Sequence, residues 1–150
     1  MSPMGTIKAP PLADQLCFDL YAASRAVTAA YRPVLTELGI TYPQYLVLIV
    51  LWEHESRTVS ELGEHLRLDH GTLTPLLKRM ETGGLIERRR GNVDERFVVV
   101  SLAARGESLR RHAERIHCDM VDRLGLVQQE FEELQDTLRL LTARVSSSAP

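Results

Sequence analysis

The sequence is poor in cysteine, in aromatic residues and in long apolar runs. Its 150 residues include two cysteines, and Phe, Trp and Tyr together make up 5%. Cys17 and Cys118 are too few for a disulfide-rich scaffold and lack the paired spacing of a zinc site, so we expect no metal and no cofactor. No apolar run approaches the ~20 residues that a bilayer span needs, and residues 1–14 lack the apolar core of a secretory signal. These absences favour a cytoplasmic protein with no membrane partner.

The chain also lacks a large net charge of either sign, since its formal net charge is −2. Its charged residues are nevertheless unevenly distributed along the sequence. Seven Lys and Arg residues stand against five Asp and Glu between Arg67 and Arg96, whereas the rest of the chain carries a net −4. A basic centre inside an acidic chain suggests one face for a polyanion. The length suits one domain, so we expect residues 1–150 to form a single domain with a substantial core.

Apolar residues at three- and four-residue steps predict a mainly α-helical chain. The first helix should begin after Asp14, as its N-cap, and run towards Leu38, where Gly39 stops it. Pro33 should kink this helix or end its regular part early. A second, largely buried helix is expected after Thr41. Two more amphipathic helices, over about 103–124 and 127–144, should break near a glycine.

The middle of the chain predicts a winged helix. Thr58 and Glu61 have the spacing of a capping box and open a short helix, which a tight turn over 67–69 connects to a second helix from about His70 to Thr82. Two β-rich runs, 85–90 and 96–102, flank a turn-forming stretch and predict a hairpin. The fold class is therefore mainly α with a small β-hairpin wing, and about 57–102 forms the DNA-binding lobe.

DNA recognition requires short polar side chains near the start of the second helix of this pair, and cations nearby to hold phosphates. Within the predicted wing, Arg96 is the best candidate to enter a minor groove, with Asp94 close enough to orient its guanidinium. An isolated run of three arginines more often solvates a hairpin, but its place directly after a helix-turn-helix favours DNA. The candidate DNA-binding residues are His70, Thr72, Thr74, Lys78, Arg79, Arg88, Arg89, Arg90, Asp94 and Arg96.

The first helix carries a polar stripe that a core does not require. Cys17, Tyr21, Ser24, Thr28 and Tyr31 step by four, three, four and three residues, so they share one helix face. Cys17 falls in the first turn, where the helix dipole and free backbone N–H groups favour a thiolate, which nearby tyrosine hydroxyls can stabilise. The alternative is a small buried cysteine, with tyrosines that pack a dimer core.

Distance adds a constraint on Tyr31. It lies fourteen residues after Cys17, about 21 Å along a helix at 1.5 Å per residue, so it cannot touch the sulfur within one continuous helix. If Tyr31 serves Cys17, it comes from an antiparallel second chain or from beyond a sharp bend. A two-fold dimer built partly on this helix would supply that geometry.

Short blocks of residues carry a family resemblance. They are Leu16-Cys17-Phe18, Leu20–Arg25, Ala30–Pro33, Thr41–Tyr45, Leu68-Asp69, Gly71–Arg79 and Asp94-Glu95-Arg96. In these blocks the chain resembles the organic hydroperoxide resistance repressors, a branch of the MarR family. The resemblance is close over about 12–102 and holds in outline over the last two helices. His70 departs from the pattern, because these repressors more often carry serine at the start of the recognition helix.

The resemblance implies a homodimeric winged helix that binds an inverted-repeat operator, with about 12–38 and 103–145 as dimerisation helices. It also implies that Cys17 is the reactive cysteine, that Tyr31 and Tyr42 reach it from the partner chain, and that Tyr21 lies near it. An organic hydroperoxide would oxidise the Cys17 thiolate to a sulfenic acid, which condenses with another thiol. In two-cysteine members that thiol lies in the later helices of the partner, and Cys118 is the candidate here.

Three functional hypotheses follow. The leading one is a repressor that binds operator DNA when reduced and is released when Cys17 is oxidised. A second is a MarR-type repressor gated by a non-covalent aromatic ligand, in which Cys17→Ser would leave induction intact. The third is a thiol peroxidase in which Cys17 turns over. The chain has no recognisable peroxidase motif, Gly-rich phosphate loop or hydrolytic triad, so we expect no enzyme.

Overall fold

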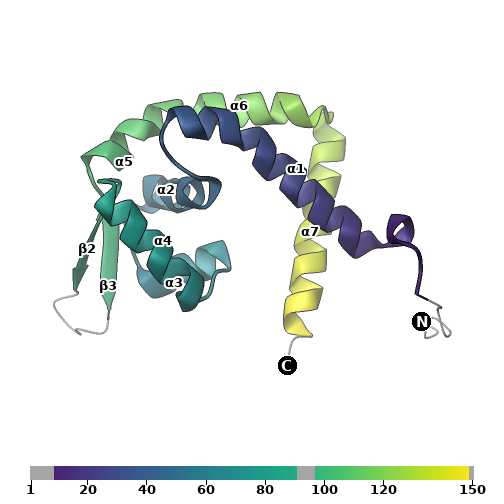
Figure 1. The fold of residues 1–150 in the computed structure, drawn as a ribbon, viewed down its shortest axis with the longest axis horizontal. Helices are drawn as coiled ribbons and strands as arrows, with labels where there is room; N and C mark the ends of the chain where they lie inside the picture. Colours follow the sequence, from purple (N-terminus) through teal and green to yellow (C-terminus); the bar gives the residue numbers. More distant parts are fainter. Residues whose placement is uncertain (1–8, 91–96, 149–150) are drawn as a thin grey trace. The chain divides into compact units, whose positions relative to one another are not determined.

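A computed structural model of the chain describes residues 9–90 and 97–148. Helices dominate it, with one small antiparallel sheet (Figure 1). The chain divides into two compact units, Met1–Arg111 and His112–Pro150. In order, the elements are η1 (Leu12–Asp14), α1 (Leu16–Glu37), α2 (Tyr42–His54), β1 (Ser56–Thr58), α3 (Val59–Leu66), α4 (His70–Thr82), β2 (Ile86–Arg90), β3 (Val98–Leu102), α5 (Ala104–Ser108), η2 (Leu109–His112), α6 (Ala113–Leu124) and α7 (Gln128–Ser147).

The most apolar helix, α2, lies at the centre of the first unit. Its sequence is apolar on nearly every side, as expected of a helix surrounded by other elements. Figure 1 shows α2 between α1 and α3. It contacts α1, α3, α4, β1 and β3, and Val47, Leu48 and Leu51 are fully buried. The indole of Trp52 donates a hydrogen bond of 3.0 Å to the carbonyl of Gly106. The core therefore forms around α2, with the predicted helix-turn-helix and wing built against it.

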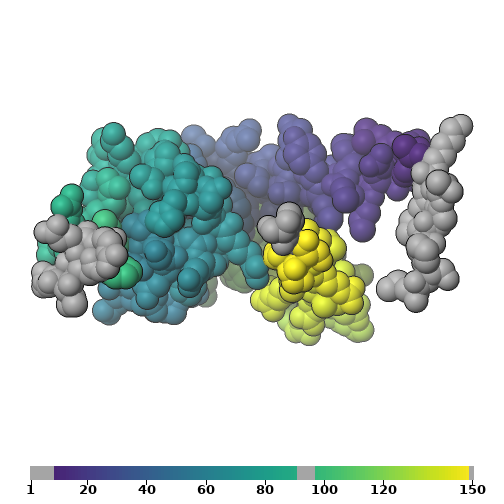
Figure 2. All heavy atoms as spheres, turned by 90° about the horizontal axis from the view of Figure 1, so that it is seen from below, coloured from purple at the N-terminus to yellow at the C-terminus, as the bar shows by residue number. Residues whose placement is uncertain are grey.

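The predicted helix-turn-helix is confirmed. Both halves of the capping box form at the start of α3, because the Glu61 amide donates to the Thr58 hydroxyl (3.2 Å) and the Thr58 amide donates to the Glu61 carboxylate (2.8 Å). The helix ends at Arg67, whose left-handed φ of 54° turns the chain toward α4. Figure 2 shows this lobe from below, with the blue-green side chains of α3 and α4 packed into one surface.

The sheet has three strands rather than the two of a simple hairpin. The strand order is β1-β3-β2, and both pairs are antiparallel. The predicted wing strands pair in register from Ile86 with Leu102 to Arg90 with Val98. The additional strand, β1, pairs Ser56 with Ser101. Three residues with a polar sequence carry no strand signal of their own, so β1 forms because β3 offers it a free edge.

The start of α1 differs from the prediction. Asp14 is not the N-cap, because it lies in the 3-10 turn η1, in which its amide donates to the Pro11 carbonyl (2.9 Å). The extended residue before the helix is Gln15, whose carbonyl accepts the amides of Phe18 and Asp19. At the other end the helix continues past Pro33 to Glu37 rather than ending early.

The expected helix over 103–124 is divided in the structure into α5, η2 and α6. At the division, the Ser108 hydroxyl donates to the Arg105 carbonyl (2.7 Å), a local bond that competes with the helical ladder. The predicted break near Gly125 is confirmed, since this residue ends α6 with a φ of 64°. The last helix, α7, continues to Ser147, three residues past the expected end.

No single helix among residues 9–90 and 97–148 has the length and apolar content to cross a membrane, although α1 and α2 together pass that test as a pair bent by 75°.

Candidate functional site

The second helix of the lobe, α4, carries five of the predicted DNA-binding residues. Its apolar residues Leu73, Leu76, Leu77 and Met80 are buried, which fixes which face turns outward. All five predicted residues of this helix are exposed: His70, Thr72, Thr74, Lys78 and Arg79. The orientation of α4 therefore leaves every one of these side chains exposed to solvent.

Asp69 holds the start of α4. Its carboxylate accepts the backbone amide of Thr72 at 2.7 Å and so caps the helix. Hydrogen bonding from the side chain and then the backbone of Thr72 holds the pKa of Asp69 below its usual range. The helix terminus beside His70 is thus fixed by a charged N-cap, which positions the residues nearest the expected base edges.

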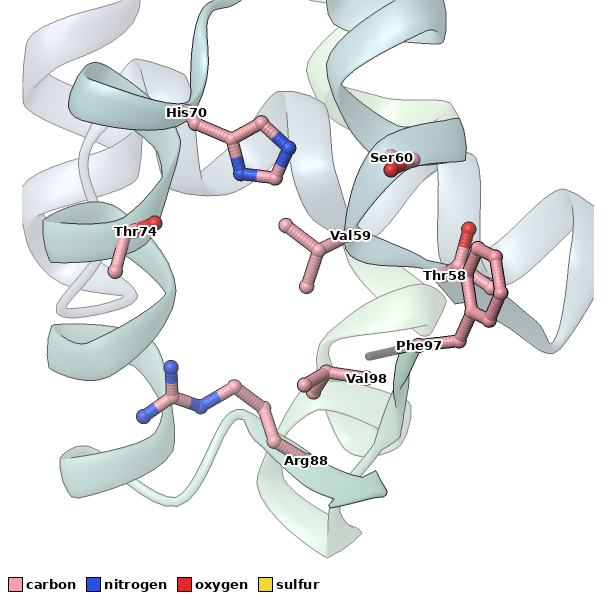
Figure 3. A pocket seen from close by; sticks show the side chains of 8 residues that line it. All are labelled: Thr58, Val59, Ser60, His70, Thr74, Arg88, Phe97 and Val98. Atoms are coloured by element: carbon pink, nitrogen blue, oxygen red, sulfur yellow. The ribbon is translucent and has the colours of Figure 1, made fainter. Parts of the chain in front are cut away.

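Three of the predicted residues surround one hollow between α3, α4 and the wing (Figure 3). His70 and Thr74 approach it from α4 and Arg88 from β2, and the hollow has a volume of about 190 Å³. The other lining residues are Thr58, Val59, Ser60, Phe97 and Val98. The wing and the recognition helix therefore form one continuous surface.

The wing arginines have different environments. Arg88 is paired with Glu81 of α4, because its Nη2 lies 3.1 Å from one carboxylate oxygen and its backbone amide donates to the other at 3.1 Å. This pairing holds the pKa of Glu81 below its usual range. Arg89 lies 3.4 Å from Glu87 and is highly exposed, and Arg90 is also exposed. The other two wing candidates, at positions 94 and 96, lie outside the described residues.

The thiol of Cys17 is free and exposed at the start of α1. With Gln15 as the N-cap, Cys17 is the second residue of the helix, so it lies in the first turn as predicted. The N–H groups of a first turn have no intrahelical acceptor and form the positive end of the helix dipole. The place of Cys17 in this first turn therefore leaves its sulfur open to solvent beside the positive end of the helix dipole.

Three of the four tyrosines form a cluster. The ring centre of Tyr31 lies 4.8 Å from that of Tyr42 and 5.9 Å from that of Tyr45. Burial raises the pKa of Tyr31 and of Tyr42, and burial with its two tyrosine neighbours raises the pKa of Tyr45 to about 12. These phenols keep their protons at neutral pH and remain hydrogen-bond donors. Tyr21 stands apart, 59% exposed, with the Arg25 guanidinium 5.4 Å from its ring centre.

The tyrosine cluster and Cys17 do not meet within one chain. Cys17 and Tyr31 lie on the same unbroken helix, α1, and the fourteen residues from one to the other span about 21 Å. Tyr42 and Tyr45 belong to α2, with their rings beside that of Tyr31. The bend that would have let Tyr31 fold back is absent, since α1 continues beyond both residues to Glu37. If Tyr31 serves Cys17, it therefore does so from a second chain.

Cys118 lies on α6, in the second unit, and its thiol is free and exposed. The structure does not bring a metal site to it: in the described part of the chain, no group of three or more His, Cys, Asp or Glu side chains has the geometry to hold a metal ion. The two cysteines belong to different units of the chain.

Comparison with known proteins decides the family. The family model described as transcriptional regulator SarA/Rot matches residues 29–112. The organic hydroperoxide resistance transcriptional regulator of Bacillus subtilis (strain 168) is 53% identical over 124 residues, which are 83% of this chain and 82% of that protein. The chain belongs to the MarR family of transcriptional regulators. The resemblance to the hydroperoxide resistance branch is confirmed by that match.

Solved structures of another MarR regulator, AbfR, share the fold. The structure of reduced AbfR bound to DNA is 38% identical, has a TM-score of 0.70 and covers 87% of this chain and 96% of that chain. The structure of disulfide-formed AbfR is 40% identical, has a TM-score of 0.61 and covers 87% and 92%. A further AbfR structure is from Staphylococcus epidermidis. The predicted winged-helix fold is thereby confirmed.

Sequence reasoning did not single out three residues that the structure places beside the predicted ones. Tyr45 was not among the predicted sensor residues, although its place three residues after Tyr42 puts both on one helix face. Ser60 and Phe97 line the hollow beside His70, which follows from the packing of α3 and β3 against α4 rather than from any motif. The sequence did offer a signal for Ser60. It is a polar residue in the first turn of α3, the first helix of the helix-turn-helix, and such a helix crosses the DNA backbone.

Proposed function

We propose that this protein is a peroxide-sensing transcriptional repressor. It binds an inverted-repeat operator as a homodimer when Cys17 is reduced, and organic hydroperoxides release it by oxidising Cys17. The observation that carries the proposal is the exposed Cys17 thiol in the first turn of α1, in a chain 53% identical to an organic hydroperoxide resistance regulator. The AbfR structures, one reduced on DNA and one with a disulfide formed, support a redox switch in this fold.

The chemistry at Cys17 balances without a cofactor. The thiolate sulfur attacks one peroxide oxygen, an S–O bond forms, and the O–O bond breaks. The peroxide is reduced by two electrons and leaves as an alcohol after it gains a proton, while Cys17 becomes a sulfenic acid. A second thiol then forms an S–S bond with Cys17, and water leaves. We assign that second thiol to Cys118 of the partner subunit or to a small thiol.

Homodimer formation brings the tyrosines to the sulfur. An antiparallel packing of two α1 helices places Tyr31 and Tyr42 of the partner subunit against Cys17, where their protonated hydroxyls donate hydrogen bonds to the thiolate. Exposed apolar residues support the proposed dimerisation segments. Val127, the N-cap of α7, and Leu134 and Leu138 on this helix step by seven and four residues and are 64%, 47% and 40% exposed.

Release follows from geometry. The recognition helices of a dimer must match successive major grooves, about 34–36 Å apart. Oxidation of Cys17 moves the dimerisation helices and so changes the separation of the two α4 helices. The exposed residues of α4 and the wing then lose their register with the operator. A regulator of this kind acts on the chromosome, so we place it in the cytoplasm.

A binding titration tests the proposal. Fluorescence anisotropy of DNA from the region upstream of the protein's own gene is measured with and without cumene hydroperoxide, for wild type, Cys17→Ser and, as a matched control, Cys118→Ser. We expect wild type to release DNA on oxidation and Cys17→Ser to stay bound. A non-reducing gel then shows whether the Cys118→Ser change abolishes an intersubunit disulfide.

Other outcomes contradict the proposal in distinct ways. Release of both wild type and Cys17→Ser, or of neither, refutes the cysteine switch and favours a MarR regulator gated by a non-covalent aromatic ligand. Repeated peroxide turnover with a thiol reductant favours a thiol peroxidase, whereas one equivalent of peroxide per sensing thiol agrees with a sensor that is not an enzyme. Failure of the reduced protein to bind refutes that operator.

A further inference from the structure

One arginine outside the predicted site contacts the ends of two helices. Arg105, the second residue of α5, donates from Nη2 to the carbonyls of Leu38 (3.1 Å) and Gly39 (3.2 Å) at the end of α1. Its other terminal nitrogen, Nη1, donates to the carbonyl of Gly83 (3.0 Å) at the end of α4. These partners lie 67, 66 and 22 residues away in sequence.

Both helices end in the same way, with a glycine at positive φ. At the end of α1, Gly39 has a φ of 70° and the Ile40 amide reaches back to the helix at 3.0 Å. At the end of α4, Gly84 has a φ of 73° and the Leu85 amide reaches back at 2.9 Å. Each ending leaves its last carbonyls without a hydrogen-bond donor from the helix itself, at the negative end of the helix dipole. One guanidinium accordingly serves the negative ends of two helices.

The contact at α1 also requires a glycine. A Cβ atom at Gly39 would lie 2.6 Å from Nη2 of Arg105, so any other residue would displace the guanidinium. The bridge equally requires an arginine. A guanidinium presents its donors on separate nitrogens of a planar fork, whereas the ammonium of lysine is one point charge and can serve one helix end at a time.

We infer that Arg105 is a positioning residue that couples α1, the helix of Cys17, to α4, the recognition helix. This inference rests on the proposed function and deepens it, because it names the path by which a movement of α1 reaches the DNA-binding surface. The guanidinium holds the two helix ends together, so a displacement of the end of α1 displaces the end of α4. Arg105 and both helices belong to the same compact unit.

Arg105→Lys is the decisive variant. It keeps the positive charge beside both helix ends but removes the two-nitrogen bridge. The matched control is Arg110→Gln, because Arg110 also donates from Nη2 to a distant carbonyl, that of Trp52 at 2.7 Å, which belongs to α2 rather than to α1 or α4. The full-length proteins are compared in melting temperature and in the operator Kd of the reduced and peroxide-treated forms. Hydrogen exchange is measured at the amides of Ile40 and Leu85.

We expect Arg105→Lys to fold and to bind operator when reduced. Its ratio of oxidised to reduced Kd should fall about fivefold or more below that of wild type, the size of a typical coupling between sites. Exchange should rise at both helix ends in Arg105→Lys and at neither end in Arg110→Gln. An Arg105→Lys protein that keeps the wild-type ratio overturns the inference, because a charge alone then suffices. An equal loss in Arg110→Gln overturns it too.

Failure of the proposed function gives a different result. If the operator Kd of wild type does not change on oxidation of Cys17, the redox switch is refuted. The exchange data still decide the coupling in that case, since faster exchange at both Ile40 and Leu85 in Arg105→Lys supports a bridge and unchanged exchange overturns it. If Arg105→Lys lowers the melting temperature strongly, the same comparison is made at a lower temperature, at which the variant is folded.

Discussion

Replacing Gly106 by alanine should destabilise the protein strongly, and the structure sets the size of the effect. Gly106 is buried in α5, and an added Cβ would overlap the carbonyl oxygen of Leu85. The same Cβ would lie 3.1 Å from the Leu85 carbonyl carbon and 3.2 Å from a methyl group of Leu102. Because the nearest atoms belong to the backbone, α5 itself must move.

That movement has a calculable cost. Overpacking of a core typically costs 1–3 kcal/mol. The shift also strains two hydrogen bonds of 3.0 Å, from the Ala103 amide to Leu85 and from the Trp52 indole to Gly106, each worth about 1 kcal/mol. We therefore expect Gly106→Ala to lower the free energy of unfolding by about 3–5 kcal/mol, a large part of the ~5–15 kcal/mol of a typical domain.

Urea unfolding measures this change, followed by the fluorescence of Trp52, the one tryptophan of the chain. Protomer concentration must be held constant, because dimer stability depends on it. Gly71→Ala is the matched control: its Cβ would lie 3.5 Å from the Asp69 carboxylate, an ordinary contact, in a helix that favours alanine by up to about 1 kcal/mol. A loss below about 1 kcal/mol in Gly106→Ala would refute the steric reasoning.

Three further predictions concern α4, the DNA and the tyrosines. Asp69→Ala should lower stability at neutral pH, because it removes the cap of α4. The folded pKa of Asp69 is lowered, so its contribution to stability is complete above the usual pKa of an aspartate and is lost as pH falls through the folded pKa. The urea midpoints of wild type and variant should therefore converge in acid. Lys78→Ala should weaken operator binding and reduce the slope of log K against log salt by about 0.9, while Arg123→Ala on α6 leaves the slope unchanged. The raised pKa of Tyr45, about 12, predicts a contribution to stability that is complete below pH about 10 and is lost as pH rises through about 12, because the unfolded chain ionises first. Urea unfolding across this pH range should show a smaller loss in Tyr45→Phe, and an equal loss in both proteins would contradict the assignment.

Family resemblance and local pattern predicted much of the site. The exposed row on α4, from His70 to Arg79, follows from a buried leucine face with a period of 3.6 residues, which leaves the opposite face to solvent. The place of Cys17 in a first turn also survived the correction of the N-cap from Asp14 to Gln15, because one residue of shift leaves it in the same turn. The DNA-binding and sensing roles of these residues remain predictions until the binding titrations are made.

What the sequence by itself determined is the set of local features that depend on neighbours within a few residues. The capping box of Thr58, the cap at Asp69 and the glycine stops after α1 and α4 are interactions of this kind, because their partners lie within about one helical turn. The family also followed from sequence, since short motifs carry it.

Only the tertiary structure decided the features whose partners are distant in sequence. The strand β1 exists because β3 lies beside it, and the Arg88 guanidinium is held by Glu81 because the wing folds back on α4. Arg105 spans two helix ends for the same reason. A residue pattern reports which face of an element is apolar, but it does not report which distant carbonyl a guanidinium meets, because that depends on how all the elements pack together.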